Sequence, residues 1–363
     1  MIVLTVNSGS SSIKLAAYEV SRTGPHKRLA ADHQSGETLD EHATLQRFLA
    51  SVPTTPAAVA HRVVHGGTRF TKPARIDDSV VRQIEGLSEL APLHNPKALR
   101  WIAAARSIFG PDVAQVAAFD TAYFASLPRV AAEYALPARL GIDEGVRRYG
   151  FHGLAHEAMW RRWRELNADG ERLITLQLGG GCSIAAIAAG RPLDTSMGFS
   201  PLEGLVMATR CGDIDAAVVP YLQHRLGISA EQVITQLNHE AGIAGLSGGS
   251  GDFTELLARN DAGSHFALDL YCYRARKYVG AYLAVLGGCD GIAFGGGVGE
   301  HVPGVRARIL EGLRWAGIEI DPVANERARG EEALISPPGG RIKVHVIPVD
   351  EEEMLVDAAV AAT

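Results

Sequence analysis

Three glycine- and serine-rich turns are the first feature of this chain that could carry chemistry. They occupy residues 7–12, 179–183 and 295–300. Glycine lets backbone N–H groups surround a phosphate, and serine hydroxyls add donors, so three such loops around one cleft would suit a nucleoside triphosphate. Ordinary tight turns have the same composition. The chain lacks a P-loop motif, and the first two turns join strand to strand, which argues against Walker-type and Rossmann nucleotide binding.

Two arginines lie where apolar stretches give way to turns. Arg62 precedes a His-Gly-Gly sequence, and Arg210 precedes a Cys-Gly pair. A planar guanidinium matches a carboxylate or a phosphoryl group through paired hydrogen bonds. The two arginines could therefore clamp a small anionic substrate and neutralise a phosphoryl group in transfer. Either arginine could equally be paired with a carboxylate in a core.

Four histidines occur in two pairs with a spacing of four, His61 with His65 and His152 with His156. On a helix this spacing would suit a metal. Neighbouring glycines disfavour a helix at both places, and neither pair has the glutamate of an HExxH motif, so a metal site is not favoured. His152, between Phe151 and a glycine, could instead donate to a developing charge.

Oxygen ligands for Mg²⁺ or Mn²⁺ are available at the ends of predicted strands. Asp120 and Glu351 are the candidate carboxylates, and Asn7 is a candidate neutral ligand. The pattern alone favours a helix N-terminal charge for Glu351, which stands in a run of three glutamates. Lys14 follows the serine turn and could sit beside phosphates or point outward from a strand.

Regular elements must position these residues. Two hairpins of matching pattern, at residues 2–20 and 173–189, suggest a duplicated domain whose copies face each other across a cleft. Helical periodicity is present in the segments 77–90, 96–109, 216–226, 230–237 and 263–286. Strands are predicted at 113–119, 291–294 and 344–349, the last followed by a helix to residue 362. The mixed order favours the α/β class.

Composition narrows the functional classes. The 363 residues carry a net charge of −6 without a basic run, which excludes a strong footprint for nucleic acid or an anionic membrane. No apolar stretch approaches the roughly 20 residues of a membrane span, so we expect a cytoplasmic protein. The four cysteines lack CxxC spacing, which favours free thiols. The 40 glycines are about 11% against a usual 7%, so they should have positional roles.

Several long, ordered sequence blocks resemble the acetate kinases. They are NSGSSSIK at residues 7–14, HRVVHGG at 61–67, LAPLHNP at 90–96, AFDTA at 118–122, RYGFHG at 148–153, and DTSMGFSPLEG at 194–204 continuing to RCG at 210–212. The resemblance spans nearly the whole chain. It implies reversible, ATP-dependent phosphorylation of acetate to acetyl phosphate, in two duplicated domains of the actin-like ATPase and sugar kinase fold (ribonuclease H-like) around a central cleft. It also implies a homodimer, for which the helix at 263–286 is the candidate surface.

The resemblance implies roles for individual residues. The arginines matching Arg62 and Arg210 bind the carboxylate and the phosphoryl group, and the histidine matching His152 donates to the transition state. The residues matching Asp120, Glu351 and Asn7 support magnesium and positioning. The acyl pocket is expected to comprise Val64, Leu93, Phe151 and Pro201. Since one methylene is worth only about 1–3 kcal/mol of discrimination, propionate is a credible second substrate.

Nucleotide contacts are expected in the three turns and one further loop. The expected residues are Ser10, Ser12, Lys14, Gln177, Gly179, Gly180, Gly181, Asp252, Phe253, Thr254, Gly296, Gly297 and Gly299. Gln177, Gly180 and Thr254 replace the histidine, asparagine and arginine usual in the family, and Phe124 replaces a further histidine. Because side-chain donors are lost, we expect ATP binding to be weakened.

The expected domain limits are 1–148 with 351–363 for the first domain and 149–350 for the second. The alternatives to an acetate kinase are a propionate or broader short-chain acyl kinase and, from another class, a clamp that hydrolyses ATP without phosphorylating an acid. The retained Arg62, His152 and Arg210 argue against the clamp, because it has no use for a carboxylate site.

Overall fold

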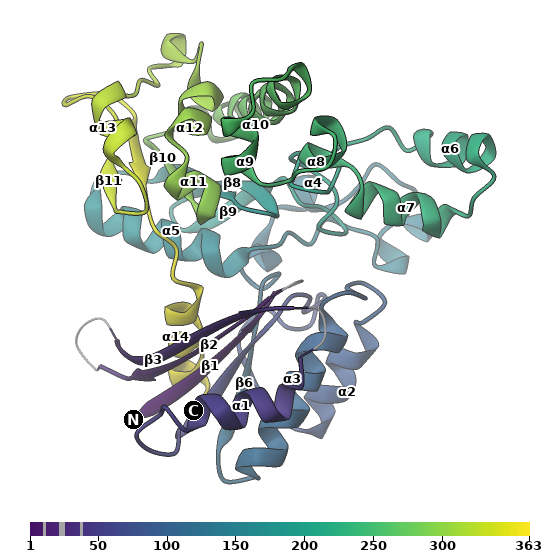
Figure 1. Ribbon diagram of the computed structural model, residues 1–363, viewed down its shortest axis with the longest axis vertical. Helices are drawn as coiled ribbons and strands as arrows, with labels where there is room; N and C mark the ends of the chain where they lie inside the picture. The colour runs from purple at the N-terminus through teal and green to yellow at the C-terminus, as the bar shows by residue number, and fades with distance from the viewer. Residues whose placement is uncertain (10–11, 22–25, 37–38) are drawn as a thin grey trace. The chain divides into compact units, whose positions relative to one another are not determined.

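The computed structural model describes residues 1–9, 12–21, 26–36 and 39–363 (Figure 1). These residues form two compact units. Unit 1 comprises Met1–Ala125, Phe151–Leu154 and Asp350–Thr363, and unit 2 comprises Ser126–Gly150 and Ala155–Val349. The domain limits expected from the sequence stay a prediction. Among the described residues, no helix is both long enough and apolar enough for a membrane span.

Unit 1 is built on a six-stranded sheet of order β3-β2-β1-β4-β6-β5. Its strands are β1 (Ile2–Ser8), β2 (Ser12–Glu19), β3 (Lys27–Ser35), β4 (Ala58–Val63), β5 (Ala74–Arg75) and β6 (Ala114–Phe119). Strands β1, β4 and β6 are parallel, whereas β2, β3 and β5 are antiparallel to their neighbours. The carboxyl ends of the three parallel strands therefore meet at one edge, where functional side chains can gather.

Helices cover both faces of this sheet. They are α1 (Glu41–Leu49), α2 (Asp78–Gly86), α3 (Asn95–Phe109) and α14 (Glu351–Ala362). Leu4 and Val6 of β1 pack with Trp101 of α3 in one apolar cluster. The C-terminal helix α14 lies against β1, β4 and β6 (Figure 1). Because side chains alternate along a strand, the β1 residue between Leu4 and Val6 faces away from the cluster that contains Trp101.

Unit 2 repeats the strand topology of unit 1. Its sheet has the order β11-β12-β10-β7-β8-β9. The strands are β7 (Arg172–Leu178), β8 (Cys182–Ala188), β9 (Arg191–Thr195), β10 (Gly291–Gly295), β11 (Ala333–Leu334) and β12 (Lys343–Val346). The parallel strands are β7, β10 and β12, in the places that β1, β4 and β6 hold in unit 1. The α/β class and the duplication predicted from the two hairpins are confirmed.

The helices of unit 2 are α4 (Arg129–Ala132), α5 (Gly153–Leu166, which begins in unit 1), α6 (Val218–Leu226), α7 (Ala230–His239), α8 (Gly242–Ser247), α9 (Phe253–Ala258), α10 (Ala262–Leu286), α11 (Gly296–His301), α12 (Pro303–Leu310) and α13 (Pro322–Arg327). Short 3₁₀ turns occupy Tyr123–Ser126, Ala138–Leu140, Ile142–Glu144 and Arg314–Ala316. Helix α7 has a complete capping box, and α10 begins at an Asp261 cap and ends at Gly287 in the left-handed conformation.

One expected loop is wrong. Residues 295–300 were expected to form a glycine loop after a strand, but Gly296–His301 forms helix α11 directly after β10. Gly296 has φ 75°, and a Cβ there would lie 2.6 Å from the backbone oxygen of Leu178. Only glycine fits this tight connection from strand to helix. The sequence did not predict the helix, because six residues are too few to show a helical period.

Other glycines are required by packing. Trp163 is fully buried, and its ring lies against Gly291 of β10 and Gly170. A Cβ added to Gly291 would lie 2.5 Å from the indole nitrogen of Trp163. Because interiors are close-packed, neither the strand nor the ring can move away cheaply.

We therefore expect Gly291→Ala to lower the free energy of unfolding by about 1–3 kcal/mol, the usual effect of overpacking a core. Chemical denaturation measures it. The matched control is Gly304→Ala in α12, where a Cβ would meet nothing within 4 Å. Equal stability of the two variants would contradict this account of the glycine excess.

Candidate active site

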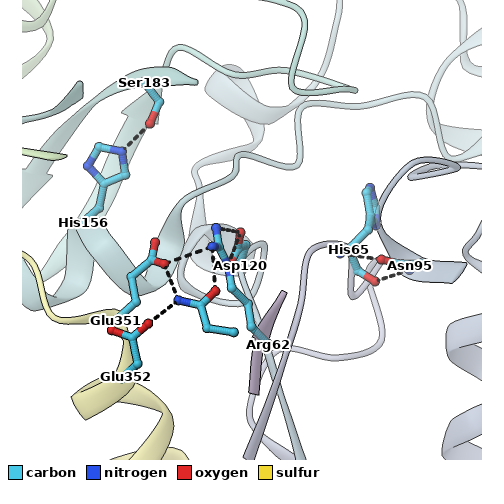
Figure 2. A network of polar contacts seen from close by, with 9 residues as sticks. Arg62, His65, Asn95, Asp120, His156, Ser183, Glu351 and Glu352 are labelled. Atoms are coloured by element: carbon cyan, nitrogen blue, oxygen red, sulfur yellow. Dashed lines mark hydrogen bonds and ion pairs between the residues drawn. The ribbon is translucent and has the colours of Figure 1, made fainter. Parts of the chain in front are cut away.

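Arg62 lies at the centre of a buried polar cluster in unit 1 (Figure 2). Its Nε donates to Asp120 Oδ1 at 2.9 Å, and its Nη2 donates to Asp120 Oδ2 at 2.7 Å. Its Nη1 donates to Asn7 Oδ1 at 3.1 Å and to Glu351 Oε2 at 2.9 Å. Asn7 and Arg62 come from the carboxyl ends of β1 and β4, Asp120 follows β6, and Glu351 begins α14. The structure thus brings Arg62 together with Asp120, Glu351 and Asn7, which the sequence had grouped as candidate metal ligands.

Glu352 completes the cluster and was not predicted from the sequence. The Asn7 amide donates to Glu351 Oε2 at 2.9 Å and to Glu352 Oε1 at 2.8 Å. The Glu352 side chain is buried. In a run of three glutamates, the one that turns inward depends on how α14 packs on the sheet. The available signal was the alternation along β1, which directs Asn7 toward one face of the sheet.

The electrostatics of the cluster are dominated by burial. Burial raises the pKa of Asp120, and the Arg62 guanidinium only partly offsets the rise. Burial also raises the pKa of Glu352, against the nearby positive charge of Lys14. Burial disfavours the charge on Arg62, but Asp120 and Glu351 outweigh it and hold the Arg62 pKa above its ordinary value. The cluster therefore holds more acidic than basic groups in a poorly solvated place.

The donor set of this cluster fits a divalent cation that arrives with phosphate. Asp120, Glu351 and Glu352 offer carboxylate oxygens, the hard ligands that Mg²⁺ prefers. Within the described ranges, no three acidic, histidine or cysteine side chains are grouped so as to hold a metal by themselves. Mg²⁺ usually needs only one or two protein carboxylates when phosphate oxygens and water supply the rest. The fit is to a phosphate-bound ion rather than to a closed protein cage.

His152 lies on a strained turn that is attached to Asp120. It has φ 58°, which is rare for a residue with a side chain. The next residue, Gly153, donates its N–H to the backbone oxygen of Asp120 at 2.9 Å, and a Cβ on Gly153 would overlap that oxygen. A backbone hydrogen bond from His152 also lowers the pKa of Asp120. Such strain, about 1–3 kcal/mol, persists where the surroundings enforce it and is common in active sites.

The loop that follows Arg62 is held by Asn95. The His65 N–H donates to Asn95 Oδ1 at 3.1 Å, and Asn95 Nδ2 donates to the His65 carbonyl at 3.0 Å (Figure 2). The His65 ring packs edge-on against Phe151, with centroids 5.6 Å apart. Asn95 was missed as an individual residue, although it lies in a block that carries the family resemblance. It fixes the loop at the end of β4 to the start of α3.

Burial lowers the pKa of His61 and of His65 to about 4, so both are neutral at pH 7.

Of the expected acyl-pocket residues, Val64 and Phe151 are buried in unit 1, and Leu93, in the same unit, is 53% exposed. Pro201 lies in unit 2.

Arg210 in unit 2 is a mostly buried cation of a different kind. Its Nη1 contacts the Pro201 carbonyl at 3.3 Å and the Met207 sulfur at 3.8 Å. Among the residues the structure describes, no carboxylate lies within ion-pair distance of it. Burial lowers the pKa of Arg210. A guanidinium withdrawn from water without a counter-ion is prepared for an anionic ligand.

Ten of the thirteen expected nucleotide residues fall into three groups. Ser10 lies outside the described residues, whereas Ser12 and Lys14 lie on β2 in unit 1, Lys14 with an exposed side chain. In unit 2, Gly179, Gly180 and Gly181 form the turn between β7 and β8. Gln177 is the last residue but one of β7, and its buried Oε1 has no donor among the described residues. Gly296, Gly297 and Gly299 lie in α11.

The remaining three residues have evident roles in local structure. Asp252 caps α9 by accepting from the N–H groups of Thr254 at 2.7 Å and of Glu255 at 3.0 Å. Phe253 is buried and packs edge-on against Tyr271. These roles leave the expected nucleotide contacts of this loop as a prediction.

His156 anchors the hairpin that carries the 179–183 turn. Its Nδ1 lies 2.7 Å from Thr175 Oγ1. Its Nε2 lies 2.7 Å from Ser183 Oγ, the contact drawn in Figure 2. His156 is fully buried on α5. A helix was expected to be disfavoured beside Gly153, and this expectation is wrong, because α5 begins at Gly153 and contains His156. His152 lies before the helix, with φ 58°.

Comparison with known proteins gives a consistent result. The family model described as the acetokinase family matches residues 26–357. The acetate kinase of Chloroherpeton thalassium (strain ATCC 35110 / GB-78) is 48% identical over 303 residues, which cover 81% of this chain and 73% of that protein. A crystal structure of Porphyromonas gingivalis acetate kinase is similar with a TM-score of 0.88 at 34% identity, covering 99% of both chains. A propionate kinase from Francisella tularensis subsp. tularensis SCHU S4 gives 0.89 at 31% identity, covering 100% of both chains. These structures confirm the expected fold class.

Removing the guanidinium from the cluster should destabilise unit 1 in a pH-dependent way. We expect Arg62→Gln to cost about 3–5 kcal/mol at neutral pH, because it leaves buried carboxylates unpaired. The raised pKa of Asp120 means that its protonation favours the folded state, a contribution that is lost as pH rises through the folded-state pKa. Since Arg62 lowers that pKa, its removal raises it further, and the deficit should shrink as pH falls.

Urea denaturation at a series of pH values measures this deficit. The control is the double variant Arg62→Gln with Asp120→Asn, in which both charges are absent and the losses should be less than additive. A deficit that is the same at all pH values would show that the ion pair is not its cause.

Proposed function

The chain belongs to the acetokinase family, and from that premise we propose that it is an acetate kinase. It transfers the γ-phosphoryl group of ATP to acetate, giving acetyl phosphate and ADP, and the reaction is reversible. The observation that carries this proposal is the mostly buried guanidinium of Arg210, which has no carboxylate partner among described residues. A clamp that only hydrolyses ATP has less need of such an anion site in addition to Arg62.

The chemistry needs no strong base. Short carboxylic acids ionise near the pKa range of Asp and Glu, so acetate is already a nucleophile at neutral pH. One carboxylate oxygen forms a bond to the γ-phosphorus, the bond from that phosphorus to the β,γ-bridging oxygen breaks, and ADP leaves with the electron pair. Catalysis is then mainly alignment and neutralisation of charge on the transferring group.

Residues already identified suit these tasks. We propose that Arg62 and Arg210 bind the carboxylate and the phosphoryl group, and that His152 donates a hydrogen bond to a phosphoryl oxygen. The attachment of Gly153 to Asp120 supports this, because it fixes the backbone next to His152. Asp120 and Glu351, with Asn7, would hold Mg²⁺ or Mn²⁺ together with phosphate oxygens, and the bound ion would offset phosphate charge.

Substrate range depends on a small apolar pocket. We propose that Val64, Leu93, Phe151 and Pro201 contact the acyl group. The buried Val64 and Phe151 support an apolar wall in unit 1. Propionate is the expected second substrate, since one methylene is worth only about 1–3 kcal/mol. The similarity to the Francisella propionate kinase is consistent with this.

We also propose that the enzyme acts in the cytoplasm as a homodimer through helix α10. Its outer face carries Phe266 and Tyr273, which are 57% and 55% exposed. These two residues are seven positions apart, and they therefore lie on one face of the helix. Aromatic side chains of this kind are enriched at subunit interfaces.

Trapping the product as a hydroxamate tests the reaction directly. With ATP and Mg²⁺, we expect acyl hydroxamate from acetate, less from propionate and least from butyrate. Arg210→Ala should lower kcat by about 10²–10³-fold, the usual cost of a lost transition-state donor. The matched control is Arg225→Ala, at an exposed position of α6. ATP hydrolysis without hydroxamate from any acid would contradict the proposal and favour the clamp.

The departures from the family in the second turn predict a gain by substitution. We propose that weak ATP binding follows from the missing side-chain donor at Gly180. A Cβ at Gly180 would meet nothing within 4 Å, and its backbone is outside the left-handed region. Gly180→Asn should therefore lower the KM for ATP about three- to ten-fold, as one hydrogen bond would, and leave the KM for acetate unchanged. A KM for ATP that is unchanged or higher would count against this explanation.

A further inference from the structure

We propose that Glu300 is a positioning residue that ties the nucleotide-binding end of α11 to the segment leading into Glu351. The inference rests on the proposed function, because it concerns the ATP and metal side of that reaction. The Glu300 Oε1 atom accepts from the N–H of Gly296 at 2.7 Å and from the N–H of Val349 at 3.2 Å. One carboxylate oxygen thus joins two backbone segments far apart in the sequence.

The first of these contacts lies at the glycine step from β10 into α11. Gly296 is the first residue of α11. The first N–H groups of a helix have no partner within it, so a carboxylate that reaches back satisfies one of them. A Cβ on the next residue, Gly297, would meet nothing within 4 Å. Glu300 therefore fixes the backbone of this turn from one side and leaves the Gly297 side open.

The backbone of Glu300 is itself held rigidly. Arg306 is fully buried, and its Nη1 donates to the carbonyls of Gly299 at 2.8 Å and of Glu300 at 3.0 Å. Its Nη2 donates to the carbonyls of Asn325 and Ala328, each at 2.7 Å. The Glu300 carbonyl also accepts from Gly330 N–H at 3.0 Å. With its main chain fixed in this way, Glu300 can act as an anchor for other segments.

The second contact lies just before the charged cluster of unit 1. Val349 is the last residue of unit 2, and the chain continues through Asp350 to Glu351, which accepts from Arg62 and Asn7. Only two peptide links separate the anchored amide from the proposed metal ligand. Glu300 therefore holds the chain two residues before Glu351.

Two variants separate the tie from a general effect on stability. Glu300→Gln keeps the Oε1 acceptor and removes only the charge, whereas Glu300→Ala removes the acceptor. We expect Glu300→Ala to raise the KM for Mg-ATP about ten-fold, the equivalent of about one charged hydrogen bond. Its KM for acetate should stay within about two-fold of the wild-type value, and Glu300→Gln should recover most of the loss. Glu240→Ala, at an exposed position, is the control.

Amide hydrogen exchange gives a readout that does not depend on activity. Peptides that contain Gly296 and Val349 should both exchange faster in Glu300→Ala and stay protected in Glu300→Gln. If Glu300→Ala does not fold, Glu300→Asp serves in its place, since the shorter side chain cannot reach both amides. Unchanged exchange at either amide, an unchanged KM for Mg-ATP, or equal effects of the Gln and Ala variants would overturn the inference. Failure of the wild type to form acyl phosphate would overturn the proposed function instead. Amide hydrogen exchange alone would then test whether Glu300 joins the two segments.

Discussion

A buried guanidinium and buried carboxylates stabilise one another in unit 1, and most of the site depends on this ion pairing. Asp120 and Glu351 stabilise the charge of Arg62 at this depth, and the Arg62 guanidinium partly offsets the rise that burial causes in the pKa of Asp120. Removing charges from water costs several kcal/mol per ion, and good geometry with further hydrogen bonds is needed to offset this cost. Asn7 supplies those bonds by accepting from Arg62 and donating to both glutamates. The fold offsets the desolvation cost of the cluster, because it brings three strand ends and the start of one helix to the same place.

The duplication places different residues at equivalent strand ends of the two units. In unit 1 the ends of the parallel strands β1, β4 and β6 carry Asn7, Arg62 and Asp120. In unit 2 the equivalent strands β7, β10 and β12 lead into Gly179, Gly296 and the segment that ends at Val349. The first copy therefore carries polar and charged side chains at these strand ends, whereas the amides of Gly179, Gly296 and Val349 in the second copy donate within unit 2. Glu300 joins two of the three strand ends in the second copy.

The sequence was sufficient for features that depend on local order. Both hairpins, the helices at α3, α7 and α10, and the residues Arg62, Asp120 and Glu351 could be predicted from pattern and motif. Glu352, Asn95 and Glu300 could not, because each acts through a partner at least 30 positions away or through a helix too short to give a periodic signal. Gly153 and Gly291 are similar cases, since the atoms that exclude a Cβ there belong to other elements.

The most direct test of the account follows the oxygen that acetate contributes. With wild-type enzyme, Mg-ATP and acetate labelled with ¹⁸O in both carboxylate positions, ³¹P NMR reports which atom is bonded to phosphorus in the product. Attack by the carboxylate on the γ-phosphorus predicts an isotope-shifted acetyl phosphate resonance with ¹⁸O in the bridging position, and ADP free of ¹⁸O. Release of unlabelled inorganic phosphate without labelled acetyl phosphate would contradict the account, because water would then be the acceptor.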